Sequence, residues 1–499
     1  WVTAALGIWA ALLVECYGHV VGDDGLEGRL VYPQLFQGRS EGDAKVLKLS
    51  DDLEFTLRKS EKVFGDSIIV RTFKENGVDM EEHMLDTAEF ENLLYQDEDQ
   101  MAAVSVKEQE GLQVEGVLGM GLRIRPVPEM ERSDEGHVAH LVYKVDEGDS
   151  SDTRAVRETI HRAQVSERQD RSSGTPRWTI YPEVYVISDS THASYFNKAR
   201  DPKKNAVEYY GIFLNAVNLR YKSVSNPRVW IRIMGITLNS KEEDNKYIYP
   251  IPPDSSVPIW GVESLYNLTY YIGRQKLYAE YDIVYLNIGL DLLGYESEGR
   301  PQNYRGFAFE GTACEYYRTG IGEDWYRRFM GIHVFAHEVA HSLGCPHDGE
   351  SSVVQGGTGS AHCPWNDGYI MSYKDTGLNH FKFSKCCNEM ITFIANRNKC
   401  LQQLNVPVSK RVRHHKFPGA VVNMTKQCQW WYPKVTETYA MTDYAMGICQ
   451  VKCYMPKWYL GWEAYKVLSV MDGTPCISKK QNTACYNGLC NPIISLKGS

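Results

Sequence analysis

The sequence predicts a central α/β domain, preceded by a cysteine-free region and followed by a small domain held by disulfides. Strand-like and helix-like segments alternate from Thr179 to Leu343, which is typical of an α/β domain. The chain has 499 residues, enough for three or four domains. Of its 13 cysteines only Cys16 precedes Cys314, so cross-links are expected in the C-terminal part alone.

The N-terminal segment 1–18 is apolar from Trp1 to Val14 and reaches small residues near Gly18. This pattern predicts a secretory signal peptide with cleavage near Gly18, and a buried helix is the alternative. No apolar run of 18 residues follows, so we expect no membrane anchor. In an exported chain, the even number of remaining cysteines predicts disulfides and a secreted, extracellular location.

Residues 19–171 are rich in charge and contain no cysteine. Apolar residues in 137–145 predict a strand, so we expect this region to fold. The region ends in Arg168-Gln-Asp-Arg171 before Ser172, which is typical of a furin-type processing site. These features predict a propeptide over 19–171 that is removed by cleavage after Arg171, and a solvated charged loop is the alternative.

The next elements follow from periodicity, because alternation with β-branched and aromatic residues favours strands and apolar residues at three- and four-residue spacing favour helices. Strands are predicted at 179–188, 228–238, 282–290 and 306–314, and helices at 205–221, 261–277 and 325–343. Asp324 is predicted as the N-cap of the last helix. A polar connector, 405–427, leads to 428–499, where six cysteines predict a small cysteine-rich domain.

The net charge of −9 excludes one class of function. A protein that binds nucleic acid needs a basic surface, so no nucleic-acid partner is expected. Hydrophobic residues make up 43% and charged residues 23% of the chain, an ordinary globular composition.

Residues 337–348 have the spacing of a metal site on a helix. His337 and His341 lie four residues apart, so their imidazoles share one face. Imidazole nitrogens suit Zn²⁺, and three protein ligands leave the fourth position for water. Glu338 lies beside that position, where it would act as the general base on the metal-bound water and then protonate a leaving amine.

The third ligand must come from a chain that turns back, because the next turn of the helix lies too far away. Gly344 is the residue type that ends a helix with a positive φ, and Pro346 prevents the helix from continuing. His347 is therefore predicted as the third metal ligand. His333 lies one turn before His337 on the same stripe and is predicted as a core or supporting residue.

This segment resembles the metzincin zinc proteases, whose pattern is H-E-x-x-H-x-x-G-x-x-H followed by a Met-turn. With Asp348 directly after the third histidine, the segment resembles the reprolysin or adamalysin branch of this family. That branch includes snake-venom and ADAM-type proteases. The resemblance implies a metalloprotease domain over 172–404. It implies that Met371 forms an apolar floor beneath the zinc. It also implies that Tyr373 either contacts the oxyanion or forms part of the cleft wall.

The resemblance further implies a twisted five-stranded mixed sheet with helices and a zinc cleft. Four strands are expected to be parallel, and 306–313 is expected to be an antiparallel edge strand along which an extended substrate binds. A calcium site with Glu183 and Asp282 is also implied. Gln403 stands where the family usually has Asn, so carboxylates that are solvated or that cap elements remain the alternative.

Disulfides in this domain are likewise implied by the resemblance. The candidates are Cys314, Cys345, Cys363, Cys386, Cys387 and Cys400. The family suggests the pair Cys314–Cys400, and the other pairings stay open because six cysteines allow fifteen connectivities. For Cys345, a disulfide that anchors the turn to the Met-turn region is favoured over a free thiolate that binds metal.

Two further features concern latency and modification. ADAM-type propeptides often hold the zinc with a cysteine, which 19–171 lacks, so latency would require steric blocking or a carboxylate ligand. Asn267 and Asn423 begin glycosylation sequons.

The whole arrangement is most similar to salivary metalloproteases of blood-feeding ticks. This likeness implies a secreted zinc metalloendopeptidase that cleaves extracellular proteins such as fibrinogen, fibrin or matrix proteins. The alternative is an antihaemostatic protein that binds its target through the cysteine-rich tail. Fold alone does not decide the substrate.

Overall fold

The computed structural model describes most of the chain, in two compact units formed by residues 1–411 and 412–499. The described residues are 19–21, 26–37, 44–119, 121–145, 178–251, 258–295, 301–372, 374, 377–404, 422–432, 434–442, 445, 449–460, 462–470, 474–476, 483–486 and 489–492. The predicted signal peptide and processing site, and Tyr373, lie outside them. No helix in these ranges is long and apolar enough to cross a membrane.

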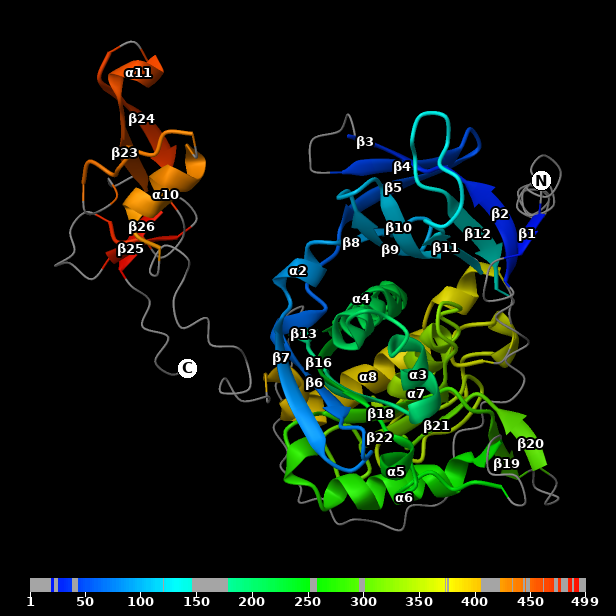
Figure 1. Ribbon diagram of the computed structural model, residues 1–499. Helices are drawn as coiled ribbons and strands as arrows, with labels where there is room; N and C mark the ends of the chain where they lie inside the picture. Colours follow the sequence, from blue (N-terminus) through cyan, green and yellow to red (C-terminus); the bar gives the residue numbers. More distant parts are fainter. Residues whose placement is uncertain are drawn as a thin grey trace. The chain divides into compact units, whose positions relative to one another are not determined.

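A seven-stranded sheet forms the centre of the first unit (Figure 1). Its strands, in spatial order, are β21 (Gly306–Ala308), β22 (Thr319–Glu323), β18 (Ile283–Ile288), β14 (Glu183–Ser188), β16 (Arg232–Leu238), β6 (Phe64–Phe73) and β7 (Met80–Asp86). Strands β22, β18, β14 and β16 are mutually parallel, and β21 is an antiparallel edge strand. The inner strands are runs of buried Val, Ile and Leu because helices and loops cover both faces.

Residues 178–404 contribute five of these strands, four parallel and one antiparallel, but the sheet has seven strands because the N-terminal region supplies two more. Strand β6 pairs in parallel with β16, with Phe64 opposite Ile233, and β7 forms an antiparallel hairpin with β6. The N-terminal region thus adds to the sheet at the edge opposite β21. The sequence pattern gave no indication of this pairing, since the partner strands lie more than 150 residues apart.

The rest of the N-terminal region is a ten-stranded antiparallel sheet, which confirms that it folds. Its strands are β1 (His19–Val21), β2 (Glu27–Val31), β12 (His140–Lys144), β11 (Leu122–Pro126), β10 (Gln113–Leu118), β9 (Ala102–Lys107), β8 (Leu94–Asp97), β5 (Leu53–Lys59), β4 (Lys45–Ser50) and β3 (Gln34–Gln37). The short helix α2 (Ala88–Glu91) joins β7 to this sheet.

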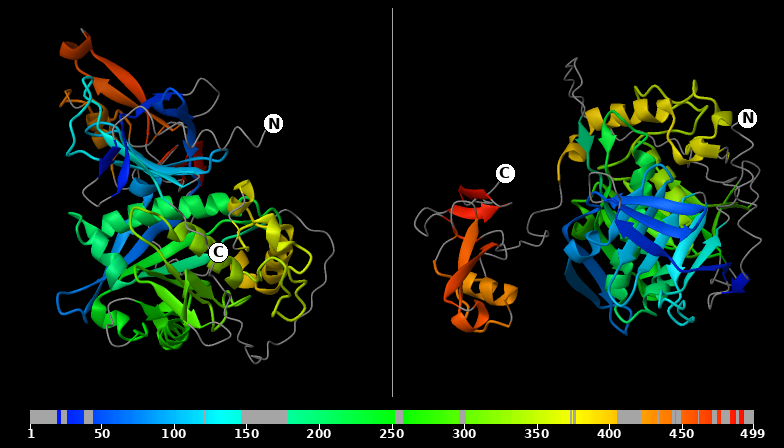
Figure 2. Two further views of the ribbon diagram at one scale, coloured as in Figure 1. Left: turned by 90° about the vertical axis from the view of Figure 1, so that its right-hand side faces the viewer. Right: turned by 90° about the horizontal axis from the view of Figure 1, so that it is seen from above.

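Helix α4 (Pro202–Tyr221) lies between the two sheets (Figures 1 and 2). It begins with Pro202 at its first turn, where Asp201 caps the free N–H groups of Lys203 and Lys204. Almost every residue from Ala206 onward is buried, because strands β8 to β10 cover one side and the central sheet covers the other. Its buried polar side chains Asn215, Asn218 and Arg220 each donate to a backbone carbonyl, as burial on all sides requires.

The remaining helices of the first unit frame the central sheet. They are α3 (Ser190–Phe196), α5 (Lys241–Asp244), α6 (Gly261–Gly273), α7 (Gly331–Ser342) and α8 (Lys385–Arg397). Short strands complete the unit at β13 (Thr179–Ile180), β15 (Arg228–Val229), β17 (Ile259–Trp260), β19 (Leu292–Tyr295) and β20 (Pro301–Tyr304). Pro182 precedes β14, so the strand predicted at 179–188 is divided in two.

The second unit is small and contains the six C-terminal cysteines. Its elements are α10 (Met424–Trp431), β23 (Gln450–Met455), α11 (Lys457–Leu460), β24 (Ala464–Ser469), β25 (Thr483–Tyr486) and β26 (Leu489–Pro492). Its disulfides are Cys428–Cys453, Cys449–Cys485 and Cys476–Cys490. Helix α10 begins four residues before the predicted domain boundary at 428, within the segment predicted as a polar connector.

Candidate metal centre

Helix α7 carries the first two histidines of the predicted metal site, and its start differs from the prediction. The helix begins at Gly331, not at Trp325, because Arg327 and Phe329 have positive φ angles of 65° and 52°. Asp324 is therefore not the N-cap. Its Oδ1 instead accepts a hydrogen bond from the N–H of Gly331 at 3.0 Å, across the intervening loop.

The end of α7 follows the predicted turn. Gly344 has a φ of 98°, its N–H donates to the carbonyl of His341, and the N–H of Cys345 donates to the carbonyl of Ala340. This pair of hydrogen bonds is a Schellman motif, which satisfies the last helical carbonyls and reverses the chain. The reversal brings His347 back to the helix face that carries His337 and His341.

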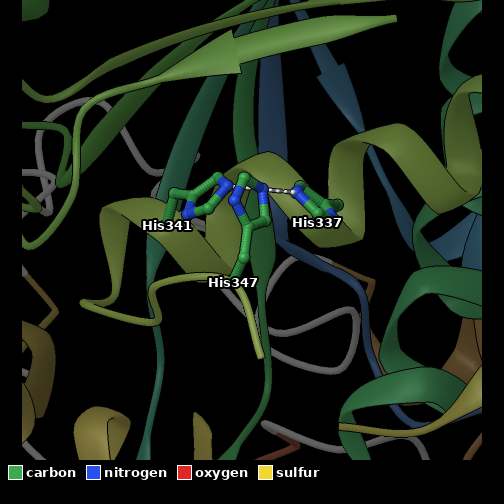
Figure 3. A group of neighbouring side chains, drawn as sticks. All are labelled: His337, His341 and His347. Atoms are coloured by element: carbon green, nitrogen blue, oxygen red, sulfur yellow. Dashed lines mark hydrogen bonds between the residues drawn. The ribbon is translucent and has the colours of Figure 1, made fainter. Parts of the chain in front are cut away.

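The three imidazoles converge on one point (Figure 3). The Nε2 atom of His337 lies 3.0 Å from Nε2 of His341 and 3.2 Å from Nε2 of His347. All three side chains are buried. Their ligand atoms form the one cluster of potential metal ligands among the described residues that consists of histidines alone.

Hydrogen bonds determine which ring nitrogen of these histidines carries the proton. The Nδ1 atom of His337 lies 2.8 Å from the carbonyl of Ile370, and Nδ1 of His341 lies 2.7 Å from the carbonyl of Cys345. A carbonyl only accepts, so each Nδ1–H is the donor and each Nε2 presents a lone pair. The Nδ1 atom of His347 lies 3.3 Å from a carboxylate oxygen of Glu350, which favours the same tautomer.

The electrostatics of the site favour neutral imidazoles. Burial, followed by the charge of His347, lowers the pKa of His337 to about 3. Burial also lowers the pKa of His341 well below its usual value, and the neighbouring histidines add to this effect. His337 and His341 are therefore neutral at neutral pH.

This arrangement fits a metal ion. The Nε2 lone pair of His337 faces the Nε2 atoms of His341 and His347 at 3.0 and 3.2 Å, and facing lone pairs repel each other unless a cation lies between them. A tetrahedral zinc with metal–nitrogen distances of about 2.0–2.1 Å would separate its ligand nitrogens by about 3.3 Å. The Nδ1–H donors also match the partners that usually orient metal-binding histidines.

Glu338 follows His337 on α7, and its side chain lies under the edge strand. A Cβ placed on Gly306 of β21 would lie 2.7 Å from Oε1 of Glu338, so the carboxyl reaches the backbone of that strand. Burial raises the pKa of Glu338 well above its usual value. Its Oε2 is buried and forms no hydrogen bond within the described part of the chain. A buried acid group is thus held next to a sheet edge, on the residue that follows the first predicted metal ligand.

Asp348 and the Met-turn residue hold the loop that carries His347. The N–H of Asp348 donates to the carbonyl of Met371 at 3.0 Å, and its Oδ1 accepts from the hydroxyl of Ser384 at 2.5 Å. Ser384 is also the N-cap of α8, so one side chain links the loop to that helix. Met371 itself is fully buried in the main core.

Three disulfides surround this region. They are Cys314–Cys400, Cys345–Cys387 and Cys363–Cys386, and the first is the pair that the family resemblance suggested. Cys345 is bonded and is not a free thiolate. Its partner Cys387 lies in α8, so the turn after α7 is tied to that helix and not directly to the Met-turn.

A buried polar network that the sequence analysis missed anchors the start of α7. The carboxylate of Asp324 accepts hydrogen bonds from the Tyr209 hydroxyl at 2.7 Å and from Asn287 Nδ2 at 3.0 Å. His192 Nε2 lies 3.2 Å from the same carboxylate, and its Nδ1 contacts the Ser188 hydroxyl. Burial raises the pKa of Asp324, but His192 and the other donors lower it by more than burial raises it. The net shift of this pKa is therefore downward.

The other predicted site residues are not part of the histidine cluster. Glu183 and Asp282 are adjacent and buried, with the N–H of Glu183 donating to Asp282 Oδ2 at 2.9 Å. Asn267 is exposed on α6. Asn423 is the N-cap of α10, and its side chain accepts from the N–H of Lys426. The calcium site and both glycosylation sites stay predictions.

A helix with two histidines, a third histidine after a glycine turn and a buried glutamate is the arrangement of a metal-dependent hydrolase. Residues 293–384, which contain these four residues, match the family profile described as "Reprolysin_5: Metallo-peptidase family M12". The chain therefore carries a metalloprotease domain of the reprolysin type, similar to those of ADAM-like metzincins.

Similar proteins come from several animals. "A disintegrin and metalloproteinase with thrombospondin motifs like" from Bombyx mori is 28% identical over 71% of this chain and 59% of that protein. "Venom metalloproteinase antarease TserMP_A" from Tityus serrulatus is 26% identical over 74% of this chain and 91% of that protein. "Venom metalloproteinase BumaMPs1" from Olivierus martensii is 27% identical over 74% of this chain and 90% of that protein.

These similarities have defined limits. The chain spans only about three fifths of the Bombyx mori relative, so the activity of that whole protein is not transferred. A solved structure described as "Structure of a chaperone-substrate complex" covers 44% of this chain and 36% of that chain at 16% identity, with a TM-score of 0.27, too low to indicate a shared fold. These relatives are named as metalloproteinases, which does not favour the alternative of an antihaemostatic binding protein. The likeness to tick proteins stays a prediction.

Proposed function

We propose that this protein is a secreted, zinc-dependent metalloendopeptidase that hydrolyses peptide bonds of extracellular proteins. The observation that carries the proposal is the convergence of the three imidazoles, with the buried carboxyl of Glu338 on the helix residue that follows His337. His337, His341 and His347 would hold the metal. Zinc at this position would supply Lewis acidity, which acidifies water and polarises a carbonyl.

The chain's own residues would position the reactants. Glu338 would accept the proton of the attacking water and deliver it to the leaving amine, as a general base and then a general acid. Strand β21 is the end strand of the central sheet among the described strands, and it passes directly over Glu338. An extended substrate that pairs with β21 would place a peptide bond beside this carboxyl.

Export and processing belong to the same proposal. Six disulfides among the described cysteines support an oxidising, extracellular location. Residues 19–171 would be a propeptide that is cleaved after Arg171. Calcium at Glu183 and Asp282 would be a second, structural ion. Fibrinogen, fibrin and matrix proteins are the substrate class that the tick-like arrangement suggests.

The test compares fibrinogen cleavage by the wild type and by Glu338→Gln at matched zinc content. Loss of a general base lowers turnover by about 10²–10⁴-fold, so we expect almost no cleavage by this variant. Glu389→Gln, on the surface of α8, is the matched control and should cleave like the wild type. Substantial cleavage by Glu338→Gln, or unchanged zinc content in His347→Ala, would contradict the proposed roles.

A further inference from the structure

The C-terminal unit carries an aromatic tip, formed by the residues that join β23 to β24. We define this aromatic tip as Trp458, Tyr459 and Trp462, which follow one another around α11. Figure 1 shows α11 at the free end of the hairpin, away from β25 and β26. Trp462 and Trp458 are 67% and 60% exposed and are the two most exposed aromatic side chains among the described residues.

The exposed apolar surface continues along the hairpin below the tip. Tyr454 and Tyr465 are opposite each other in the strand register, and Tyr439 stacks on Tyr454 with ring centroids 4.9 Å apart. Tyr465 is 47% exposed and Val467, which follows it on the same face, is 45% exposed. Single exposed apolar residues are ordinary, but a contiguous group of this size on a small domain indicates an interaction surface.

The charge of this unit differs from that of the rest of the chain. Residues 412–499 contain ten Lys and Arg but only four Asp and Glu, whereas residues 1–411 contain 44 and 59. Near the tip, Lys457 directly precedes Trp458, and Lys466 is exposed on β24. Lys452 lies over the ring of Tyr465 at 4.3 Å from its centroid. The aromatic tip is thus flanked by cations on an acidic protein.

Two carboxylates near the aromatic tip, Glu437 and Glu463, are held by neighbouring donors. Glu437 accepts a hydrogen bond from the indole N–H of Trp458 at 2.7 Å. Glu463 is hydrogen-bonded to the hydroxyl of Tyr454. These contacts satisfy the indole N–H of Trp458 and the hydroxyl of Tyr454. Burying these two rings therefore leaves fewer polar groups without partners.

A protruding tip of tryptophan and tyrosine with flanking lysines fits one kind of surface best. Tryptophan and tyrosine partition to the boundary between headgroups and acyl chains, because each has an apolar body and a polar edge. Lysines beside them are attracted to anionic headgroups. A bilayer accepts a convex tip without a shaped cavity, whereas a protein partner would have to provide one.

We propose that the C-terminal unit docks the protein on anionic lipid bilayers by inserting the aromatic tip, Trp458, Tyr459 and Trp462, into the headgroup boundary. Lys452, Lys457 and Lys466 contact the anionic headgroups. This binding is independent of the metal centre and concentrates the protein at lipid surfaces. It does not anchor the chain irreversibly, because so small an inserted group gives reversible binding.

The test measures binding of the full chain, in the Glu338→Gln form, to vesicles by co-sedimentation and tryptophan emission. Vesicles of phosphatidylcholine with about 30% phosphatidylserine are compared with pure phosphatidylcholine, because anionic lipid should strengthen binding. Burial of one large apolar side chain strengthens binding about tenfold or more. Trp458→Ala/Trp462→Ala should therefore lower the partition coefficient on anionic vesicles by about a hundredfold.

Matched variants distinguish docking through the aromatic tip from misfolding and from non-specific adsorption to vesicles. Phe36→Ala/Tyr270→Ala removes two exposed aromatic rings of the first unit and should bind vesicles like the parent protein. Lys457→Glu keeps all aromatic rings and should weaken anionic binding about fivefold or more, with little effect on neutral vesicles. Far-UV circular dichroism and the absence of free thiols verify that each variant is folded.

Three results would overturn the proposal. The first is no binding of the parent protein to either vesicle. The second is equal vesicle binding by the parent and the double tryptophan variant. The third combines two results: the parent binds no vesicles, and Trp458→Ala/Trp462→Ala loses affinity for a protein substrate. That outcome would assign the aromatic tip to a protein partner.

Discussion

The N-terminal region and the C-terminal unit are both largely β-structure, but they are stabilised in opposite ways. Residues 44–145 contain no cysteine, and strands β6, β8, β9 and β10 share one hydrophobic core with residues of the metalloprotease domain. Residues 424–492 have a small core of their own in which five of the ten buried members are cysteines. One region is therefore held by its neighbour and the other by covalent cross-links.

The hydrophobic core of the first unit contains residues that precede the predicted processing site in the sequence and residues that follow it. Phe64, Ile68 and Val70 of β6 belong to the same buried cluster as residues of β14, β16 and α7. Asn215 of α4 donates to the carbonyl of Tyr95, and the same helix is covered by β8 to β10. Loss of the N-terminal region would thus expose α4 and the edge of β16 to water.

The C-terminal unit is too small to rely on burial alone. A domain of roughly 70 residues buries too little apolar surface to offset its conformational entropy, so small domains commonly use disulfides. Loss of buried side chains in the N-terminal region and reduction of disulfides should therefore affect different parts of the molecule.

The largest effect is expected for Phe64→Ala. Phe64 is fully buried, pairs with Ile233 across the two regions and packs against Gly211 of α4. Large-to-small changes at such positions lower the free energy of unfolding by about 3–5 kcal/mol. Chemical denaturation should show this loss, and hydrogen exchange should show lower protection in both β16 and α4.

Phe55→Ala is the matched control for this prediction. Phe55 is equally buried, but its cluster contains only residues of the N-terminal sheet. Its replacement should lower protection chiefly in β4 and β5. Equal loss of protection in β16 and α4 for the two variants would show that the shared core is not what couples the regions.

The next largest effect is expected when the Cys449–Cys485 disulfide is removed. The linked residues are 36 positions apart, so the cross-link restricts a long loop of the unfolded chain. Cys449→Ala/Cys485→Ala should lower the free energy of unfolding of the C-terminal unit by about 2–4 kcal/mol. Hydrogen exchange in β23 and β24 measures this change.

Reduction of the wild type gives the complementary arm of this experiment. Dithiothreitol should lower protection in β23 and β24 more than in β4 and β5, whose hydrophobic cluster contains only residues of the cysteine-free N-terminal sheet. If both regions lose protection to the same extent, the proposed difference in their stabilisation is wrong.

The metal site was predictable because its determinants are local. His337 and His341 are placed by helical spacing, and Gly344 and Pro346 turn the chain, so a segment of eleven residues defines all three ligands. The cysteines likewise indicated a cross-linked C-terminal part. These predictions need no knowledge of distant contacts.

The failures concern contacts between distant segments. The residues from Trp325 to Met330 have helical periodicity, yet Phe329 stacks on Tyr209 at 4.5 Å and Asp324 is held by buried donors. These tertiary contacts override local preference and delay the helix until Gly331. The addition of β6 to the sheet could not be predicted for the same reason, because its partner β16 lies in another predicted domain.

The smallest effect is expected at Asn423, in the disulfide-bonded unit. Its side-chain oxygen accepts from the N–H of Lys426 at 2.8 Å and caps α10, so Asn423→Ala should cost about 1 kcal/mol. Asn423→Asp keeps the cap but removes the glycosylation sequon, so it should retain the stability of the unglycosylated protein. Thermal unfolding of deglycosylated samples measures the cap alone, and mass spectrometry of the secreted protein measures the glycan. Equal stability of the Ala and Asp variants would show that the cap contributes nothing where disulfides already hold the helix.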